Sequence, residues 1–280
     1  MREDDIPAVH DVYAAAFTDL DRRLGERFTH PYPTLEQSRP RWRRTLQTDP
    51  GGAWVAERDG SVAGVATGIL RDGVWGLSMF AVHPAAQSGG LGRELLRRAA
   101  AYGEGARGRI ILASRDPRAI ASYARLGLRL LPSVQATGVP RGVAVPRGVR
   151  RGGADDIPMT EAIDRAVRRA AHGADIAVML EGGAELLTAG ESGYVVVSHG
   201  RVRLLAARDD EAAATVLRGA LALAAAARET ALVEWITGDQ DWAVPVCLEA
   251  GLEVQTACGP VFTGGDVGPF RPYLPSGAWL

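Results

Sequence analysis

The chain repeats one series of features in the same order, and this repeat constrains the fold more than any other part of the sequence. The tetrapeptide Asp-Asp-Ile-Pro occurs at residues 4–7 and again at 155–158, each time before apolar residues at helical spacing. Two strand-like runs then flank a tight turn at 59–60 in the first half and at 199–200 in the second. An ordered series of this kind is typical of an internal duplication, so we predict two copies of one α/β unit.

A segment rich in glycine, proline and arginine separates the two copies. It covers residues 138–150 and has the composition of a loop. We therefore predict a first domain at 1–137, a linker at 138–150 and a shorter second domain at 151–280. The C-terminal tail, which contains Tyr273 and Trp279, is expected to pack at the junction of the domains.

Composition excludes several classes of protein. The 280-residue chain contains no lysine, whereas the P-loop and the protein-kinase site both need one. A net charge of -1 gives no bulk attraction to nucleic acid or membrane, and the acidic start does not resemble a signal peptide. Two cysteines are too few for a disulfide framework, and five histidines are scattered without ligand spacing. We expect a cytoplasmic protein without a metal site.

The stretch VHPAAQSGGLGRELL, residues 82–96, follows a strand-like run and leads directly into a helix-like one. Helix N-termini leave N–H groups unpaired and carry partial positive charge, so they bind phosphates where glycines allow close approach. A dinucleotide fingerprint would need a third glycine at Leu95. The loop therefore predicts a phosphate site of another kind, and a glycine-rich turn without a ligand is the alternative.

The segment Gln87-Ser88-Gly89-Gly90-Leu91-Gly92 resembles the acetyl-CoA signature of the GNAT N-acetyltransferases, Gln/Arg-x-x-Gly-x-Gly/Ala. In that family the loop amides hold the pyrophosphate of the coenzyme, and the preceding strand pairs with its pantetheine arm. A backbone N–H near Val82 would stabilise the oxyanion. The resemblance implies coenzyme contacts from Phe80, Ala81, Val82, Gln87, Ser88, Gly89, Gly90, Leu91, Gly92 and Arg93.

A second motif also resembles this family. Asp116-Pro117, Ala119, Tyr123 and Gly127-Leu128 follow its pattern Asn-x-x-Ala-x-x-x-Tyr-x-x-x-Gly-Phe. The resemblance makes Tyr123 the acid that protonates the leaving thiolate. A thiol pKa near ~8.5 and a phenol pKa near ~10 are close enough for a short hydrogen bond to pass the proton. Alternatively, Tyr123 is a core residue of an amphipathic helix. Asp116, where the family has asparagine, is expected to cap that helix.

The second copy has lost both motifs. Its equivalent of the loop places Asp209, Asp210 and Glu211 where the pyrophosphate would lie, and these carboxylates would repel the coenzyme. Cys247 stands in the place of Tyr123 without a nearby base. The chain thus resembles tandem GNAT proteins of the actinobacterial type with a degenerate C-terminal copy. This implies an α/β (α+β) fold of two GNAT units, each a mixed, mostly antiparallel sheet flanked by helices.

The resemblance implies an acyltransferase that moves the acetyl group of acetyl-CoA, its cosubstrate, directly to an amine in the N-terminal domain. A non-catalytic acyl-CoA-binding or regulatory protein is the alternative, and a structural interaction protein would leave the loop glycines unexplained. A small-molecule amine is the expected acceptor, with neither nucleic acid nor membrane as partner, for a monomer or homodimer. The general base is open among Asp19, Asp21, Glu26 and the carboxylate of Leu280.

The polar region at residues 17–39 is expected to cover the acceptor side, as the first two helices do in the family. Its acidic and aromatic side chains would favour a cationic or aromatic amine, although arginines are interleaved with them. These side chains are Asp19, Asp21, Glu26, Phe28 and Tyr32.

Overall fold

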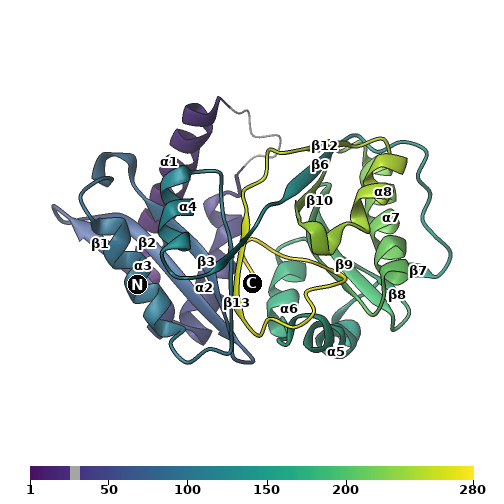
Figure 1. The fold of residues 1–280 in the computed structure, drawn as a ribbon, viewed down its shortest axis with the longest axis horizontal. Helices are drawn as coiled ribbons and strands as arrows, with labels where there is room; N and C mark the ends of the chain where they lie inside the picture. The colour runs from purple at the N-terminus through teal and green to yellow at the C-terminus, as the bar shows by residue number, and fades with distance from the viewer. Residues whose placement is uncertain (26–31) are drawn as a thin grey trace. The chain divides into compact units, whose positions relative to one another are not determined.

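The computed structural model describes residues 1–25 and 32–280. The chain divides into two compact units. The first consists of Met1–Leu70, Trp75–Ala106 and the last residue, Leu280, and the second consists of Arg71–Val74 and Arg107–Trp279. Both contain sheets flanked by helices, which confirms the predicted α/β class (Figure 1).

The first unit begins with two helices and continues with three strands and a third helix. The elements are η1 (Glu3–Asp5), α1 (Ile6–Leu24), α2 (Leu35–Thr48), η2 (Pro50–Gly52), β1 (Ala53–Arg58), β2 (Ser61–Arg71), β3 (Val74–Val82), η3 (Pro84–Ala86) and α3 (Leu91–Tyr102). Strands β1 and β2 form the predicted hairpin, and Asp59 and Gly60 have the two positive φ angles of a type I′ turn, +52° and +74°. The order in the sheet is β1-β2-β3.

The two N-terminal helices cover one face of these strands. Ile6 and Val9 of α1 and Trp42 of α2 are fully buried in one cluster with Met79 and Ala81 of β3. Thr34 and Gln37 have the spacing that predicts a capping box at the start of α2, and the box is present, because the backbone N–H groups of the two residues donate to each other's side chains. Pro40 lies inside α2, and the helix continues past it to Thr48.

Helix α1 is longer than the sequence predicts. It ends at Leu24, whereas we expect it to end near Phe17; buried Leu20 and then Leu24 continue the apolar face of the helix beyond that residue. Asp19 also forms ion pairs with Arg22 and Arg23 in these last turns. Gly25, with φ +66°, provides the left-handed residue after the helix.

The second unit contains the rest of the chain. Its elements are β4 (Gly108–Leu112), α4 (Pro117–Ala124), β5 (Arg129–Leu131), β6 (Val134–Gly138), β7 (Val149–Arg151), η4 (Ala154–Asp156), α5 (Ile157–Arg168), α6 (Ala174–Glu181), β8 (Glu185–Ala189), β9 (Gly193–Ser198), β10 (Arg201–Ala207), α7 (Asp210–Ala227), β11 (Ala231–Ile236), η5 (Gly238–Gln240), α8 (Ala243–Glu249), β12 (Glu253–Gln255), β13 (Val261–Gly265) and β14 (Tyr273–Leu274).

The main sheet of this unit has the order β12-β6-β11-β10-β9-β8-β7. Its neighbours are antiparallel apart from the parallel pair β10–β11, as expected for a mixed, mostly antiparallel sheet. Helix α7 lies against this sheet, and its alanine-rich face is buried. His199 and Gly200 form the predicted hairpin turn between β9 and β10, with φ +48° and +71°.

The two halves of the chain exchange strands. Strand β13, from the C-terminal half, lies between β4 and β5, so that Val261 is opposite both Leu112 and Leu131. Strand β6, from the N-terminal half, lies between β11 and β12, with Ala136 opposite Val233 and Val254. Each exchanged strand pairs with a neighbour on both of its edges. In two places, therefore, strands from opposite sides of the predicted linker, residues 138–150, pair with each other.

A group of polar side chains is buried beside α5. Asp164 is 2.8 Å from Nδ1 of His172 and accepts a hydrogen bond from the hydroxyl of Tyr194. Arg168 donates to the carbonyl of Ala170, and its Nε and Nη2 have no partner among the described residues. All of these side chains are buried. Although an Asp–His pair is common in active sites, this one is sealed from substrate, so we interpret it as structural.

The strand exchange predicts that the two halves fold only together. Residues 1–137 expressed alone should be insoluble or unfolded, because β4 and β5 lose the strand that joins them. A protease site inserted between Ala144 and Val145, in the exposed loop, should give two fragments that stay associated after cleavage. Size-exclusion chromatography of the cleaved chain tests this. A folded, monomeric fragment 1–137 would contradict the exchange.

The buried Asp164–His172 pair predicts a pH dependence of stability. Burial lowers the pKa of His172 below its ordinary value of 6.5, so the folded chain stays neutral there while the unfolded chain takes up a proton. Stability should therefore fall as the pH drops below about 6.5, by at most about 1.4 kcal/mol per pH unit. Urea unfolding at one pH above and one pH below about 6.5 measures the loss of stability.

The variant His172→Asn should lose less stability than the native chain over the same pH interval, because it lacks the titrating ring. His199→Asn is the matched control, since that side chain is 78% exposed. An identical pH dependence in all three proteins would show that His172 does not contribute.

Candidate functional site

The glycine loop follows β3 in a conformation that its own side chains hold. His83 caps the short helix η3 through Nδ1, which accepts from the N–H of Ala85 at 3.3 Å. Gln87 Nε2 donates to the carbonyl of Val82 at 3.0 Å and so ties the loop to the end of the strand. The side chain of Gln87 thus bonds to the backbone of the chain itself. The backbone N–H of Gln87 lies 3.4 Å from the carbonyl oxygen of Pro84.

The next residues form a concave run of backbone amides. Ser88 and Gly90 are left-handed, with φ +69° and +83°, and Gly89 between them is not. Such an alternation turns successive N–H groups toward one side, where they can bind an anion. In the part of the chain that the structure describes, the N–H groups of residues 88–93 have no hydrogen-bond acceptor. No side chain caps α3, because its N-cap is Gly90.

The three loop glycines have different structural reasons. Gly90 provides the positive φ. At Gly92 a Cβ would lie 3.3 Å from Cζ of Phe80 and 3.4 Å from Cγ2 of Val82, so its absence lets α3 begin close to β3. A Cβ on Gly89 would meet nothing within 4 Å, and its φ is not in the left-handed range. The fold therefore does not require glycine at 89, and the bare backbone there leaves room for a ligand.

Charges around the loop favour an anion. Arg93, in the first turn of α3, is exposed. Glu94 is the acidic residue of that turn, and it accepts hydrogen bonds from Arg97 and Arg98. The Arg97 contact, followed by that of Arg98, lowers the pKa of Glu94 to about 2. Its negative charge is therefore balanced by two arginines, and the positive end of α3 is left uncompensated.

Tyr123 lies in the second unit, whereas the predicted strand and loop residues lie in the first. Its ring packs edge-on against Phe262 of β13, with centroids 5.7 Å apart, and the side chain is buried. Burial, followed by the charge of Asp116, raises the pKa of the phenol well above its usual value, so it remains protonated. Asp116 caps α4 as predicted, since its carboxylate accepts from the N–H of Arg118 at 2.9 Å. The proton-donor role of Tyr123 stays a prediction.

Two of the four candidate general bases already have partners. The ion pair with Arg23 is the main cause of a lowered pKa for Asp19, which makes this carboxylate a weak base. Asp21 accepts the hydroxyl of Tyr32 at 2.6 Å. The side chain of Leu280 is buried against Gly76 of β3. Glu26 lies outside the described residues.

The predicted acceptor region contains aromatic rings that contact one another. The ring of Tyr32 lies 5.7 Å from that of Tyr13 and 5.9 Å from that of Phe17, with all three tilted or edge-on. Phe28, which the sequence analysis also placed there, lies outside the described residues. These aromatic rings therefore stabilise the packing of α1 rather than stand open to solvent.

In the second copy one of the three acidic residues, Asp209, caps the helix. The carboxylate of Asp209 accepts from the N–H of Ala212 at 2.8 Å, at the start of α7. Cys247 is fully buried, and burial raises the pKa of its thiol to about 12. A thiol in this state is not a nucleophile at neutral pH.

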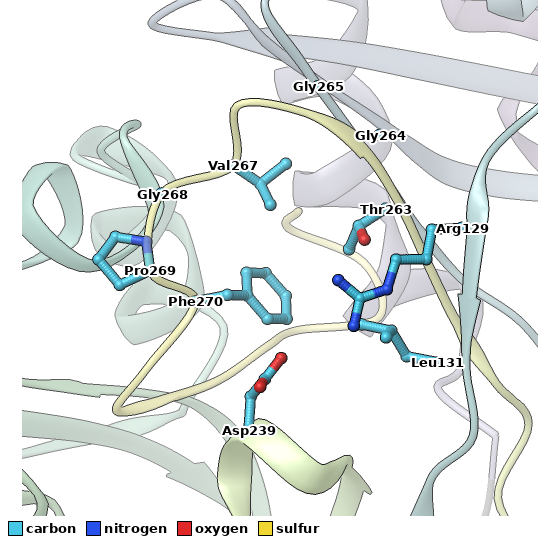
Figure 2. A pocket seen from close by; sticks show the side chains of 10 residues that line it. All are labelled: Arg129, Leu131, Asp239, Thr263, Gly264, Gly265, Val267, Gly268, Pro269 and Phe270. Atoms are coloured by element: carbon cyan, nitrogen blue, oxygen red, sulfur yellow. The ribbon is translucent and has the colours of Figure 1, made fainter.

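The second unit contains a pocket of about 390 Å³ that the sequence does not predict. Figure 2 shows Arg129 and Asp239 directed into it beside the ring of Phe270. None of the predicted site residues lines it. Its wall comes from segments near residues 130, 239 and 263–270, and no local motif connects segments so far apart.

Two further features bear on ligands and location. Within residues 1–25 and 32–280 no three His, Cys, Asp or Glu side chains are grouped so that they could hold a metal ion. None of the helices in the described ranges has both the length and the apolar character needed to cross a membrane.

Comparison with known proteins gave one family match. The model of the acetyltransferase (GNAT) family matches residues 13–128, a range that contains both the loop and Tyr123. A search of curated proteins gave no match.

Similar solved structures extend over nearly the whole chain. A Pyrococcus horikoshii protein described as an acetyltransferase has a TM-score of 0.79 at 18% identity, covering 99% of this chain and 92% of that one. A tandem GNAT protein from the clavulanic acid biosynthesis pathway has a TM-score of 0.56 at 15% identity, covering 95% and 97%. A GCN5-related N-acetyltransferase from Kribbella flavida has 0.55 at 19%, covering 94% and 69%.

At these identities the structures show a shared fold and nothing about substrates. Together with the family match, they account for both halves of the repeat. Residues 13–128 therefore match the acetyltransferase (GNAT) family, and the chain as a whole has the fold that it shares with a solved tandem GNAT protein.

Proposed function

We propose that the chain is an N-acetyltransferase that takes the acetyl group from acetyl-CoA and transfers it to an amine, with the coenzyme bound by the loop after β3. The observation that carries this proposal is the run of unpaired amides at residues 88–93 around Gly89, where the fold itself does not need a glycine. The match of residues 13–128 to the GNAT family supports acyl transfer in general. The choice of acetyl-CoA and of an amine is our inference.

The coenzyme would be held mainly by the backbone. The amides of residues 88–93 and the positive end of α3 would bind the pyrophosphate, and exposed Arg93 would add a positive charge. The end of β3, residues 80–82, would pair with the pantetheine arm as an added strand does. Few side chains are needed, which explains why the loop is rich in glycine.

The reaction would be a direct transfer. The neutral amine attacks the thioester carbonyl, the C–N bond forms and the C–S bond breaks. A backbone N–H near Val82 would stabilise the oxyanion, and Tyr123 would give its proton to the sulfur. The proton lost by the nitrogen then restores the phenol through solvent. The raised pKa of Tyr123 keeps the proton on the phenol until charge develops on the sulfur.

The proposed acceptor is a small-molecule amine. Asp19 and Asp21, which the sequence analysis offered for recognition of a cation, are both engaged by side chains of their own region. An acceptor bound through its neutral amine form and its carbon skeleton agrees better with these contacts than one bound through those two carboxylates.

The loop predicts that Gly89→Glu weakens coenzyme binding at least tenfold without loss of stability. The new carboxylate has space in the free protein but repels the pyrophosphate. Calorimetric titration with coenzyme A and a thermal melt measure the two effects. Gly238→Glu is the matched control, because a Cβ there also meets nothing within 4 Å and the φ is not left-handed. Equal affinity in both variants would argue against the loop.

The role of Tyr123 predicts that Tyr123→Phe lowers kcat about 100-fold or more and leaves the KM for acetyl-CoA within about threefold. The ring and its contact with Phe262 are kept, and only the proton donor is lost. Thiol release from acetyl-CoA across a panel of amines measures the rate. Tyr102→Phe, which loses a hydroxyl contact to Asp49, is the control. Unchanged turnover would remove Tyr123 from the mechanism.

The same assay tests the proposed function as a whole. Thermal stabilisation by acetyl-CoA together with thiol release for at least one amine would support it. Stabilisation without release for any acceptor would instead favour the non-catalytic acyl-CoA-binding protein.

A further inference from the structure

We propose that residues 271–274 of the chain occupy, in the second copy, the groove that the coenzyme occupies in the first. The second copy is then a GNAT unit whose ligand groove is filled by the C-terminal segment of the same chain. The comparison between the copies rests on the proposed function of the first loop. The contacts of the segment in the second unit stand independently of it.

The two copies present the same junction of strand and helix. In the first copy β3 ends at residues 80–82 and leads into α3, and in the second β10 ends at 205–207 and leads into α7. Both strands follow a hairpin turn with two left-handed residues, at 72–73 and at 199–200, so the repeat pairs the turn at 199–200 with this one and not, as predicted, with the turn at 59–60. Residues 205–207 are thus the counterparts of the strand end proposed to pair with the pantetheine arm.

The edge of β10 at this place is covered by the chain itself. Strands β10 and β11 run parallel and pair at Arg201 and Leu232, near the start of β10. Farther along, β14 pairs with β10 in antiparallel register, Leu274 opposite Leu205 and Tyr273 opposite Ala206. The N–H of Ala207 donates to the carbonyl of Pro272 at 3.2 Å. An extended ligand would find these backbone groups already bonded.

The start of α7 carries negative charges, whereas a phosphate site would carry positive ones. Asp209 caps the helix, and Asp210 forms an ion pair with Arg271 at 2.5 Å. The same guanidinium pairs with Asp241 at 2.8 Å. The chain therefore supplies its own anion to the helix N-terminus, and the segment supplies the cation that balances it.

The segment is anchored on both sides of Arg271. The backbone N–H of Phe270 donates to the carbonyl of Val167, and its carbonyl accepts from Gln240 Nε2, each at 2.7 Å. Phe270 is also the residue whose ring lies in the pocket of Figure 2.

On the other side, Tyr273 is fully buried, with its ring stacked on His172 at a centroid distance of 6.3 Å and the guanidinium of Arg168 5.9 Å from its centroid. The buried polar group beside α5 thus holds the segment in place. Burial of this extent is expected of a permanent occupant, and a loosely held tail would leave these side chains accessible to water.

Amide hydrogen exchange on the full chain, with and without coenzyme A, tests the proposal. The amides of residues 205–207 should be strongly protected in the free protein, and coenzyme A should not slow them further. It should slow exchange at residues 80–93 and saturate at one molecule per chain. Fast exchange at 205–207 in the free protein, or protection there that depends on coenzyme A, would overturn the proposal.

A pair of variants tests the segment without any ligand. Arg271→Ala removes both ion pairs and should speed exchange at 205–207 about threefold or more, as expected for the loss of partly exposed pairs. Arg218→Ala, which removes the pair between α7 and Glu249, is the control and should leave 205–207 unchanged. Asp241→Asn, which removes only the more exposed pair, should give a smaller change in the same direction.

Equal exchange at 205–207 in Arg271→Ala and Arg218→Ala would show that the segment does not cover β10. The two proposals fail in different ways. A chain that binds no coenzyme A refutes the proposed function, whereas the comparison of these variants is made without ligand and still decides whether residues 271–274 cover the strand.

Discussion

What each copy of this unit can bind depends on the backbone N–H groups where a strand leads into a helix, and on whether they are already hydrogen-bonded. At the start of α3 these groups have no acceptor in the described chain, and no side chain caps the helix. At the start of α7 Asp209 caps the helix, and the edge of β10 is bonded to β14. The two copies thus differ at this junction, with an uncapped helix start in one and a capped helix start in the other, and the difference lies in a few residues of loop and tail.

The exchange of β6 and β13 makes the second copy necessary even if it binds nothing. Strand β13 completes the pairing of β4 and β5, and it also carries Phe262, against which Tyr123 packs. The burial that keeps Tyr123 protonated therefore depends on residues more than a hundred positions away in the sequence. A duplicated chain can lose the chemistry of one copy and still keep that copy for folding.

Features set by a few neighbouring residues could be predicted from the sequence. The turns at Asp59-Gly60 and His199-Gly200, the capping box of α2 and the position of the glycine loop all follow from local conformational preferences. Helix α1 is longer than predicted because Leu20 and Leu24 extend its apolar face past the polar residues, and ion pairs join Asp19 to Arg22 and Arg23 in the same turns.

Long-range pairing could not be predicted in this way. The sequence of β13 would fit either sheet. Its apolar side chains predict that the strand is buried, but they do not predict which strands pair with it. The pocket around Phe270 and the cover that residues 271–274 form on β10 likewise bring together distant segments. Burial of Arg168 was also unexpected, because an arginine at this position on an amphipathic helix usually reaches solvent.

The central claim is that exposed amides around Gly89 bind the diphosphate of a coenzyme, while the equivalent helix start of the second copy is capped by its own Asp209. Backbone NMR of the full chain during titration with coenzyme A tests it most directly. The account predicts that the amide signals of residues 88–93 shift and saturate together, and that those of residues 209–212 stay in place. Signals of 88–93 that do not move, or that move no more than those of 209–212, would contradict it.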